Sequence, residues 1–283
     1  MLDFLREVYG EWRKDNALNL GAALSYYTIF SLAPLLVLVI AIAGLVFGRA
    51  AAEGQIVGQI ESLVGPAAAK TIEGMITRAS GPKASVVATL TSLATMALGA
   101  SGVFGQLQQA LNQIWEATPP PRRGIRGHIR RRMPAFGMIL GVGFLLLVSL
   151  VLSAMLAALH DWIAHHLPIA SRVLPVLNFA LSFAVITTLF AMIYKVLPDV
   201  AMHWRDVWLG AAVTALLFTV GKTLIAIYLG RTGVTSVYGA AGSLVLVLLW
   251  VYYSAQILFV GAEFTEVYSR RYGSRRGAAR GDG

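Results

Sequence analysis

GAAGSLVLVLLWVYYSAQILFVGAE, residues 239–263, is the stretch that decides the fold of this chain. It opens with small residues, continues through a block of leucine and valine, and carries no charged side chain before its last residue, Glu263. A helix needs about 20 consecutive apolar residues to cross a lipid bilayer. The stretch therefore predicts a transmembrane helix over residues 240–263.

The composition of the whole chain indicates that lipid is its solvent. Of the 283 residues, 57% are hydrophobic and 13% are charged, whereas a soluble domain carries roughly 25% charged residues. So few charges cannot cover a globule with polar surface. The absence of cysteine excludes disulfides and thiolate metal sites.

Five further apolar segments make the predicted fold class all-α, a polytopic membrane protein with six transmembrane helices. The other predicted spans are 22–47, 84–107, 134–159, 173–197 and 207–229. We expect a single membrane domain over residues 1–268. The Gly-, Ser- and Arg-rich residues 269–283 are expected to form a disordered cytoplasmic tail.

Short amphipathic helices are expected outside the spans. Residues 1–20 place apolar side chains, among them Trp12, on one side at three- to four-residue spacing. This favours a helix lying in the membrane interface over an ordinary solvated helix, because a span follows directly. Residues 48–84 mix charged and apolar residues at helical spacing and predict one or two short amphipathic helices resting on the outer surface.

The distribution of basic residues sets the predicted orientation. With the N-terminus in the cytoplasm, 16 of the 23 Lys and Arg residues lie on the inner side, 6 lie on the outer side, and Lys222 lies within a span. The inner residues are Arg6, Arg13, Lys14, six arginines within 122–132, Lys195, Arg205 and the five arginines from Arg270 onward. Both termini are therefore predicted to face the cytoplasm.

Lys222 is the charged residue that lies deep inside a predicted span. An ammonium group at that depth costs about 2.5–3.5 kcal/mol on insertion scales, so it should face the bundle or a water-filled cavity. It either contacts an anionic substrate or reaches the interface or backbone carbonyls, and the sequence favours neither. Glu263 belongs to the opposite interface, about 20 Å away at 1.5 Å per residue, so no ion pair between them is expected.

Polar residues at the inner ends of three spans suggest a vestibule open to the cytoplasm. Tyr252, Gln256 and Glu263 share one face of the last span through their i, i+4, i+11 spacing. The candidate path residues of the first two spans are Tyr27, Ser31, Pro34, Gln106 and Gln109. The alternative is that these are interfacial tyrosines and helix–helix hydrogen bonds, which accounts somewhat better for each residue taken singly.

Six arginines follow three prolines between the second and third predicted spans. A basic run can bind nucleic acid, but no aromatic residues are interleaved with this one. Beside a membrane it favours a topology determinant and a contact for anionic lipid headgroups. The arginines are Arg122, Arg123, Arg126, Arg130, Arg131 and Arg132. The bilayer and its headgroups are thus the expected partners, and nucleic acid is not.

No motif for catalysis, a metal or a cofactor is evident. Gly221-Lys222-Thr223 is similar to part of a phosphate-binding loop, but Leu216 stands where that motif requires glycine. The three histidines within 160–166 have one acidic neighbour and predict a polar turn rather than a metal site.

Three segments carry a resemblance to a known family. They are ALSYYTIFSLAPLL (23–36), VLPDVAMHWRDVWLGAAVTALLFTVGKTLIAIYL (196–229) and SVYGAAGSLVLVLLWVYYSAQILFVGAEF (236–264). The chain resembles the YihY/virulence factor BrkB family of bacterial inner-membrane proteins, once labelled ribonuclease BN. The pattern maps onto Tyr27, Pro34, Pro198, Gly210, Lys222, Tyr228, Tyr238, Gly239, Gly242, Trp250, Tyr252 and Glu263.

The resemblance implies a six-helix protein of the cytoplasmic membrane that moves a lipid-like or small polar or anionic solute. A non-transporting scaffold or envelope-assembly partner is the alternative. Ribonuclease activity is not expected, because metal-dependent phosphodiester cleavage needs clustered carboxylates or histidines. The inner acidic residues Glu116, Asp199, Asp206 and Glu266 have no ligand-like spacing.

Overall fold

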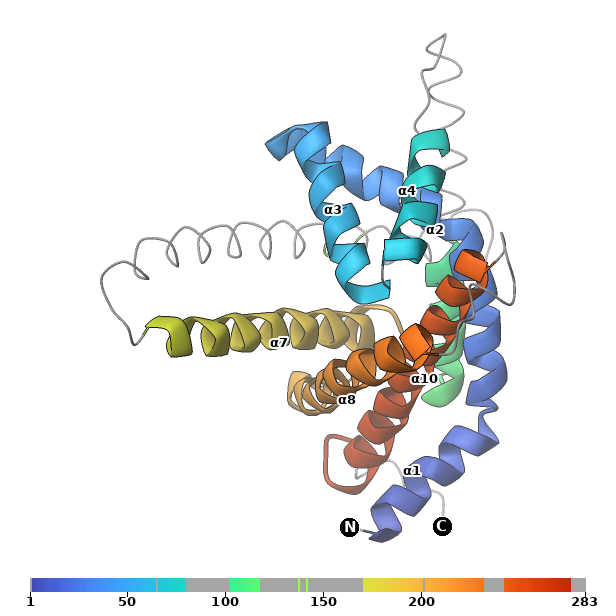
Figure 1. The fold of residues 1–283 in the computed structure, drawn as a ribbon. Coiled ribbons are helices and arrows are strands. Elements are labelled where there is room, and N and C mark those ends of the chain that lie inside the picture. Colours follow the sequence, from blue (N-terminus) through green and yellow to red (C-terminus); the bar gives the residue numbers. More distant parts are fainter. Residues whose placement is uncertain are drawn as a thin grey trace.

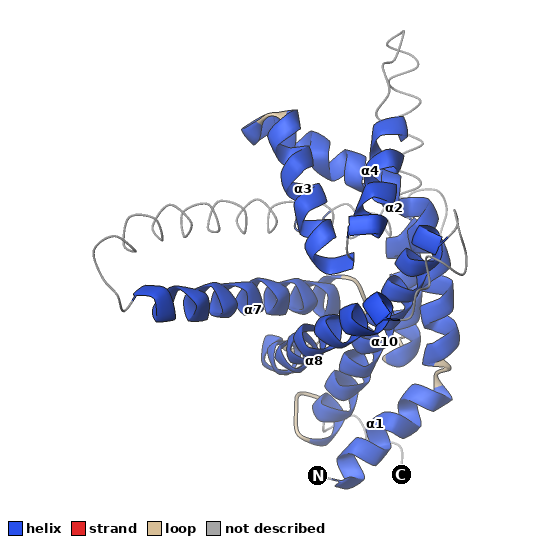
Figure 2. Ribbon diagram, viewed as in Figure 1, coloured by secondary structure: helices blue, strands red, loops and turns tan. Residues whose placement is uncertain are grey.

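The computed structural model of the chain describes residues 2–64, 66–79, 102–117, 137, 141, 170–200, 202–231 and 242–275. Within these ranges the regular secondary structure is helical and no strand occurs (Figure 2). The predicted all-α fold class is therefore confirmed for this part of the chain.

The described helices differ widely in length (Figure 1). They are α1 (Leu2–Lys14), α2 (Ala17–Phe47), α3 (Arg49–Val64), α4 (Pro66–Ala79), α7 (Ala170–Val196), α8 (Trp204–Arg231) and α10 (Gly242–Arg271), and residues 102–114 form a further helix.

Four of these helices are long and apolar enough to cross a membrane. Their apolar segments are Ala17–Ala41 of α2, Phe179–Val196 of α7, Trp204–Ile225 of α8 and Leu244–Arg271 of α10. They match four of the predicted spans. The predicted spans 84–107 and 134–159 lie outside the described residues, apart from 102–107, 137 and 141. The number of six spans therefore stays a prediction.

Helix α10 is the centre of the packing. It contacts α1, α2, α4 and α8, and α7 packs against α8 (Figure 1). The larger core cluster surrounds the second half of α10, where Phe259 and Ala262 are buried together with Trp115 and with Tyr194 of α7. Segments that are far apart in the sequence therefore meet around this half of α10.

Two glycines allow α8 and α10 to approach closely. A Cβ atom on Gly210 of α8 would overlap with the side chain of Thr265, and one on Gly261 of α10 would overlap with Thr214 and the Tyr194 hydroxyl. Between helices in lipid, van der Waals packing at small residues is a main source of association. These contacts fix the C-terminal halves of α7 and α10 and the N-terminal half of α8 relative to one another.

Helices α3 and α4 fold back onto α2 and α10. Their apolar sides form a second cluster with those two helices, made of Ile40, Ala52, Ile72, Ile76, Leu246 and Val247. The sequence predicted amphipathic helices in this region, and the structure has both. They rest on two spans rather than on the outer surface alone, because α2 and α10 offer apolar surface for Ala52, Ile72 and Ile76 to bury.

Two predicted boundaries differ from the structure. Residues 1–20 do not form one helix, because the chain turns at Asp15 and Asn16, where Asn16 has a φ of 52°. At the other end, α10 continues to Arg271, and the backbone N–H and hydroxyl of Ser274 both donate to Asp206 (2.9 and 2.7 Å). Residues 269–275 thus contact α8 and α1, while residues 276–283 lie outside the described ranges, so the disordered tail stays a prediction.

Candidate functional site

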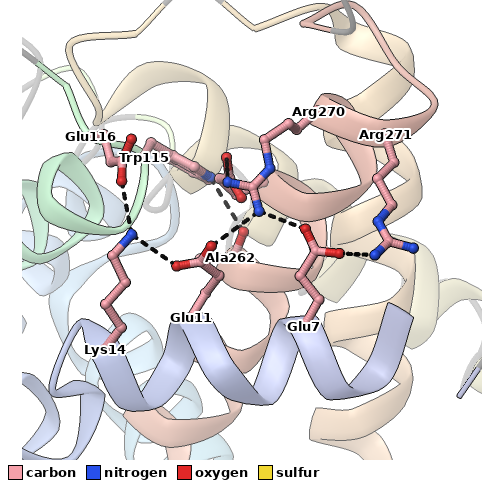
Figure 3. Close-up of polar contacts among 9 residues, drawn as sticks. Glu7, Glu11, Lys14, Trp115, Glu116, Ala262, Arg270 and Arg271 are labelled. Atoms are coloured by element: carbon pink, nitrogen blue, oxygen red, sulfur yellow. Dashed lines mark hydrogen bonds and ion pairs between the residues drawn. The ribbon is translucent and has the colours of Figure 1, made fainter. Parts of the chain in front are cut away.

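A chain of ion pairs ties α1 to the last turn of α10 (Figure 3). The guanidinium group of Arg270 contacts Glu7 Oε1 at 2.7 Å and Glu11 Oε1 at 3.1 Å, and Arg271 pairs with Glu7. Glu7 and Glu11 lie one turn apart on α1, so both face the same side of that helix. The N-terminal helix and the end of the last span are thus joined at the same end of the bundle.

The ion-pair chain continues from α1 to the end of helix 102–114. Lys14 Nζ lies 3.1 Å from Glu11 Oε2 and 3.1 Å from Glu116 Oε1 (Figure 3). Glu116 has a φ of 49°, and Ala117 N donates to the carbonyl of Asn112 at 2.8 Å. This is the Schellman end of a helix, where glycine is the preferred residue. Glu116 therefore has a backbone conformation that is strained for a residue with a Cβ atom.

Glu263 of α10 lies beside these ion pairs and takes part in none of them. Its side chain is 0% exposed, and no donor in the described ranges is within hydrogen-bonding distance of either carboxylate oxygen. The charged groups that act most strongly on it are the carboxyl groups of Asp15, Glu266 and Glu11. Asp15 is placed to share a hydrogen bond with it, which two carboxyl groups can form only when one of them carries a proton.

The corner between α1 and α2 holds Asp15 in this position. Gln113 Nε2 donates to the backbone carbonyl of Asp15 at 2.8 Å, and Asn16 adopts the left-handed conformation. Asparagine enters that conformation more readily than most residues. On the α10 side, Trp115 Nε1 donates to the carbonyl of Ala262, directly before Glu263, at 3.3 Å (Figure 3). The end of residues 102–117 thus holds the backbone on both sides of the Glu263–Asp15 pair by hydrogen bonds.

The pKa values of the acidic groups on α1 and at the α1–α2 corner are shifted in opposite directions. Burial raises the pKa of Asp15, against the opposing charge of Lys14. Burial acts in the same sense on Glu11, but hydrogen bonds from Lys14 and Arg270 outweigh it and hold the pKa of Glu11 below its usual value. Hydrogen bonds to Glu11 and Glu116 raise the pKa of Lys14. Glu11 is therefore held ionised, whereas Asp15 is displaced toward its protonated form.

A buried hydrogen-bond network joins α7, α8 and α10 near the same level. The Tyr194 hydroxyl donates to the carbonyl of Leu258 at 2.7 Å and lies 3.0 Å from Thr214 Oγ1. Beyond the end of α7, Asn112 Nδ2 donates to Asp199 Oδ2 at 2.8 Å and Asn112 Oδ1 accepts from the Asp199 backbone N–H at 2.8 Å. These polar groups satisfy one another and hold the helices together.

The structure brings part of the predicted polar face of α10 to the start of α2. Gln256 Nε2 donates to the carbonyl of Ala17 at 3.1 Å, while its Oε1 is buried without a donor in the described ranges. Tyr252 lies against Gly21. Glu263 follows Gln256 by two helical turns on α10. Buried polar atoms without partners therefore recur along this side of the helix.

The other predicted path residues are less closely grouped. Ser31 is buried and would contact a Cβ on Gly102, and Tyr27, 46% exposed, would lie near the same atom. Gln109 is exposed. The remaining two, Pro34 and Gln106, are half-buried.

Lys222 is half-buried on α8. The neighbouring Gly221 packs against Tyr253 and Ile257 of α10. None of the described residues forms an ion pair with Lys222, and the predicted lipid-binding arginines 122–132 lie outside the described ranges.

Asp15, Glu11 and Glu116 are the site residues that the sequence did not single out. The prediction of one interfacial helix over residues 1–20 gave no reason to treat Glu11 and Asp15 as other than solvated side chains. Asp15-Asn16 is a pair of turn-forming residues, and that signal was available to break the helix there. Within the described ranges, no three His, Cys, Asp or Glu side chains are grouped so that they could hold a metal ion.

Comparison with known proteins gives a match over nearly the whole chain. The family model described as "Virulence factor BrkB" matches residues 8–282. No solved structure matches the chain.

Similar curated proteins are named as membrane proteins. A UPF0761 membrane protein of Verminephrobacter eiseniae is 29% identical over 259 residues, which cover 90% of this chain and 59% of that protein. One of Pseudomonas aeruginosa strain LESB58 is 27% identical over 264 residues, 92% of this chain and 61% of that protein. One of Tolumonas auensis is 30% identical over 183 residues, 62% of this chain and 56% of that protein. The chain thus spans about three fifths of the length of these first two relatives.

Proposed function

This chain belongs to the virulence factor BrkB family, and from that premise we propose that it moves a lipid-like or small polar or anionic solute across or within the cytoplasmic membrane. Four helices suited to span a bilayer and relatives named as membrane proteins support the membrane setting. No ATP-binding motif is recognisable in the sequence, so we expect movement to be driven by a gradient.

The observation that carries the proposal is Glu263. It lies within the apolar segment of α10, completely buried, with neither carboxylate oxygen hydrogen-bonded to a described donor. A buried ionisable group without a hydrogen-bond partner is costly, and such groups commonly mark functional sites. A residue that served only to hold helices together would be expected to have its polar atoms satisfied.

The proposed path follows the polar face of α10. It includes Glu263, Gln256 with its unpaired Oε1, and Tyr252, which all lie toward α2 or the α1–α2 corner. Lys222, half-buried on α8 near the level of Tyr253, is the proposed contact for a carboxylate, phosphate or sulfate group of the solute. The arginines 122–132 are the proposed contact for anionic lipid headgroups on the cytoplasmic side.

We propose that both termini face the cytoplasm. The excess of basic residues on that side supports this orientation. The ion pairs of Glu7 and Glu11 with Arg270 support it further, because they place α1 and the end of α10 on one side of the bundle.

We also propose that the chain is not an enzyme, and in particular not a ribonuclease. Asp199 is engaged by Asn112, and Asp206 binds the backbone N–H and hydroxyl of Ser274. These contacts support structural roles for the two carboxylates. Purified protein that degraded tRNA precursors with divalent metal, and lost this activity on Asp199→Ala or Asp206→Ala, would refute this part of the proposal.

The competing function is that of a membrane scaffold. The hydrogen bonds of Tyr194 with Leu258 and of Asn112 with Asp199 favour it, because they serve helix packing alone. On this view Glu263 and Lys222 could be replaced by neutral residues without loss of function.

The experiment that separates these functions compares variants in a deletion strain, with lipid and metabolite profiles as the readout. Glu263→Gln and Lys222→Met should insert normally and fail to restore the profile. Glu73→Gln, at an exposed position of α4, is the matched control and should restore it fully. If both path variants complement while Gly210→Leu, which overlaps with Thr265, does not, the scaffold function is favoured.

A further inference from the structure

We propose that Glu263 and Asp15 together bind one proton, and that this proton is the coupling ion of the transporter. The assignment of a coupling role rests on the proposed function. The proton site itself rests on the complete burial of Glu263 and on its two oxygens without a donor in the described ranges, and it stands or falls separately.

The first step concerns the surroundings of Glu263. The charged groups that act most strongly on Glu263 are acidic: Asp15 from the α1–α2 corner, Glu11 from α1 and Glu266 from its own helix. Both of its oxygens are buried and lack a donor in the described ranges. Glu263 is therefore an unpaired carboxyl group that faces other carboxyl groups.

The second step is that the nearby cations are engaged elsewhere. Arg270 pairs with Glu7, Glu11 and Glu266, and Lys14 pairs with Glu11 and Glu116. Arg271 pairs with Glu7, and Arg275 acts on Glu266. Each of these charges lies beside another carboxylate. None of them forms an ion pair with Glu263 among the described residues.

The third step is that one bound proton removes both the repulsion between the carboxylates and the lack of a hydrogen-bond donor. Two ionised carboxylates side by side in a buried setting repel each other and lack hydrogen bonds, so one of them takes up a proton. The protonated group then donates to the other, as the placement of Asp15 allows. The proton belongs to the pair rather than to either residue.

The fourth step gives the proton a route and a consequence. Asp15 is half-buried and Glu263 is fully buried, so exchange with the cytoplasmic side passes through Asp15. Loss of the proton leaves repulsion between the α1–α2 corner and α10. The first contact of α2 with α10 beyond that corner is the hydrogen bond from Gln256 to Ala17, on the proposed path. Proton release would thus loosen α2 from α10 at this point.

The test is infrared difference spectroscopy of the full chain in lipid nanodiscs during a pH titration. At neutral pH the wild type should show the C=O stretching band of a protonated carboxylic acid. Glu263→Gln should lose this band, and Asp15→Asn should shift it, because the hydrogen-bond partner changes from a carboxylate to an amide. Glu73→Gln, which removes an exposed carboxyl group of α4, should leave it unchanged. A wild type without the band, or a band that survives Glu263→Gln, overturns the proposal.

Two further measurements separate the possible failures. Replacement of choline in the buffer by sodium at constant pH should not remove the band. If sodium removes it, sodium rather than a proton is the ion that the pair binds. A band that depends on Glu263, in a variant that still restores the deletion strain, leaves the proton site standing and refutes the transport function. If Glu263→Gln fails to complement the deletion strain and the wild type shows no carboxylic acid band, the proton site is refuted and the transport function is not.

Discussion

At the scale of single residues, the unusual features of the chain gather at one place. Glu263 is buried without a donor in the described ranges, Asn16 and Glu116 have positive φ, and Asp15 directly precedes Asn16 and accepts a hydrogen bond from Gln113 near Glu116. Strained backbones and unsatisfied polar groups each reduce stability and persist where the surrounding structure enforces them, often at functional sites. The packed core around Phe259 and Trp115 is what can enforce them here.

The raised pKa of Asp15 predicts a specific pH dependence. Because the folded protein holds this proton more tightly than the unfolded chain, whose aspartate titrates near pH ~3.9, Asp15 makes stability fall as pH rises above about 4. Asp15→Asn removes this contribution. The variant should therefore gain stability relative to the wild type between about pH 4 and pH 7, as measured by chemical unfolding in one detergent. Parallel pH profiles for the two proteins would contradict the prediction.

Glu116 permits a test of backbone strain that is separate from its charge. Both Glu116→Ala and Glu116→Gly lose the exposed ion pair with Lys14, but only glycine relieves the positive φ of 49°. We expect the glycine variant to be about 1 kcal/mol more stable than the alanine variant. Thermal unfolding of the two variants side by side measures this difference. Equal stabilities would show that residue 116 does not hold the left-handed conformation.

The sequence predicted some of these residues and not others, for physical reasons. Glu263 stood out because it ends a long uncharged stretch. Asp15 and Glu11 did not, because their importance comes from contacts with α10 and residues 102–117, which are distant in the sequence. Periodicity assigns a side chain to a face of its own helix, but not to the partner that covers that face.

At the scale of helices, α1 is an element that its ion pairs hold in place. Apart from Val8, its residues are partly or fully exposed. Its contact with α10 is made by Glu7 and Glu11 with Arg270 and Arg271, together with the ring contact of Phe4 and Phe264, whose centroids are 5.2 Å apart. Helix α1 is therefore expected to open before the bundle does.

Arg270→Gln tests the role of the ion pairs in docking α1. Removal of the guanidinium group leaves Glu7, Glu11 and Glu266 without their shared partner, at partly buried positions. We expect a loss of about 1–3 kcal/mol, less than for a fully buried pair. Hydrogen exchange should rise in residues 2–14 and stay unchanged in α8. The matched control is Lys14→Gln, whose exposed pairs should contribute only about 0–1 kcal/mol; equal effects of the two variants would contradict the prediction.

Helix positions could be predicted from apolar length, whereas helix ends and partners could not. The apolar stretches of α2, α7, α8 and α10 were evident in the sequence. The last turn of α10, up to Arg271, forms ion pairs with Glu7 and Glu11, which are distant in the sequence. The packing of α3 and α4 on α2 depends on how the apolar surfaces of these helices fit together. Tertiary contacts of this kind leave no local signal in the residues that make them.

At the scale of the whole molecule, the described helices concentrate their polar features at one end. The ion pairs of α1, the Glu263–Asp15 pair and the Asn112–Asp199 link all lie around the C-terminal half of α10. The cluster of α2, α3, α4 and α10 around Ile40 and Ile76 is apolar. In the described part of the chain, the buried polar groups and the buried apolar cluster of α3 and α4 thus lie at different places along α10.

The orientation of this polarity in the membrane is open to a direct test, because the chain has no cysteine. Single cysteines at Gly10, Ser171 and Ser274 would each be the sole target of a membrane-impermeant maleimide. With both termini cytoplasmic, Ser171→Cys should react in intact spheroplasts, whereas Gly10→Cys and Ser274→Cys should react only after lysis. The ion pairs between α1 and Arg270 require that Gly10 and Ser274 behave alike, whatever the absolute orientation. Labelling of Gly10 and Ser274 from opposite sides would contradict the fold, and labelling of all three from the same side would contradict the number of spans between them.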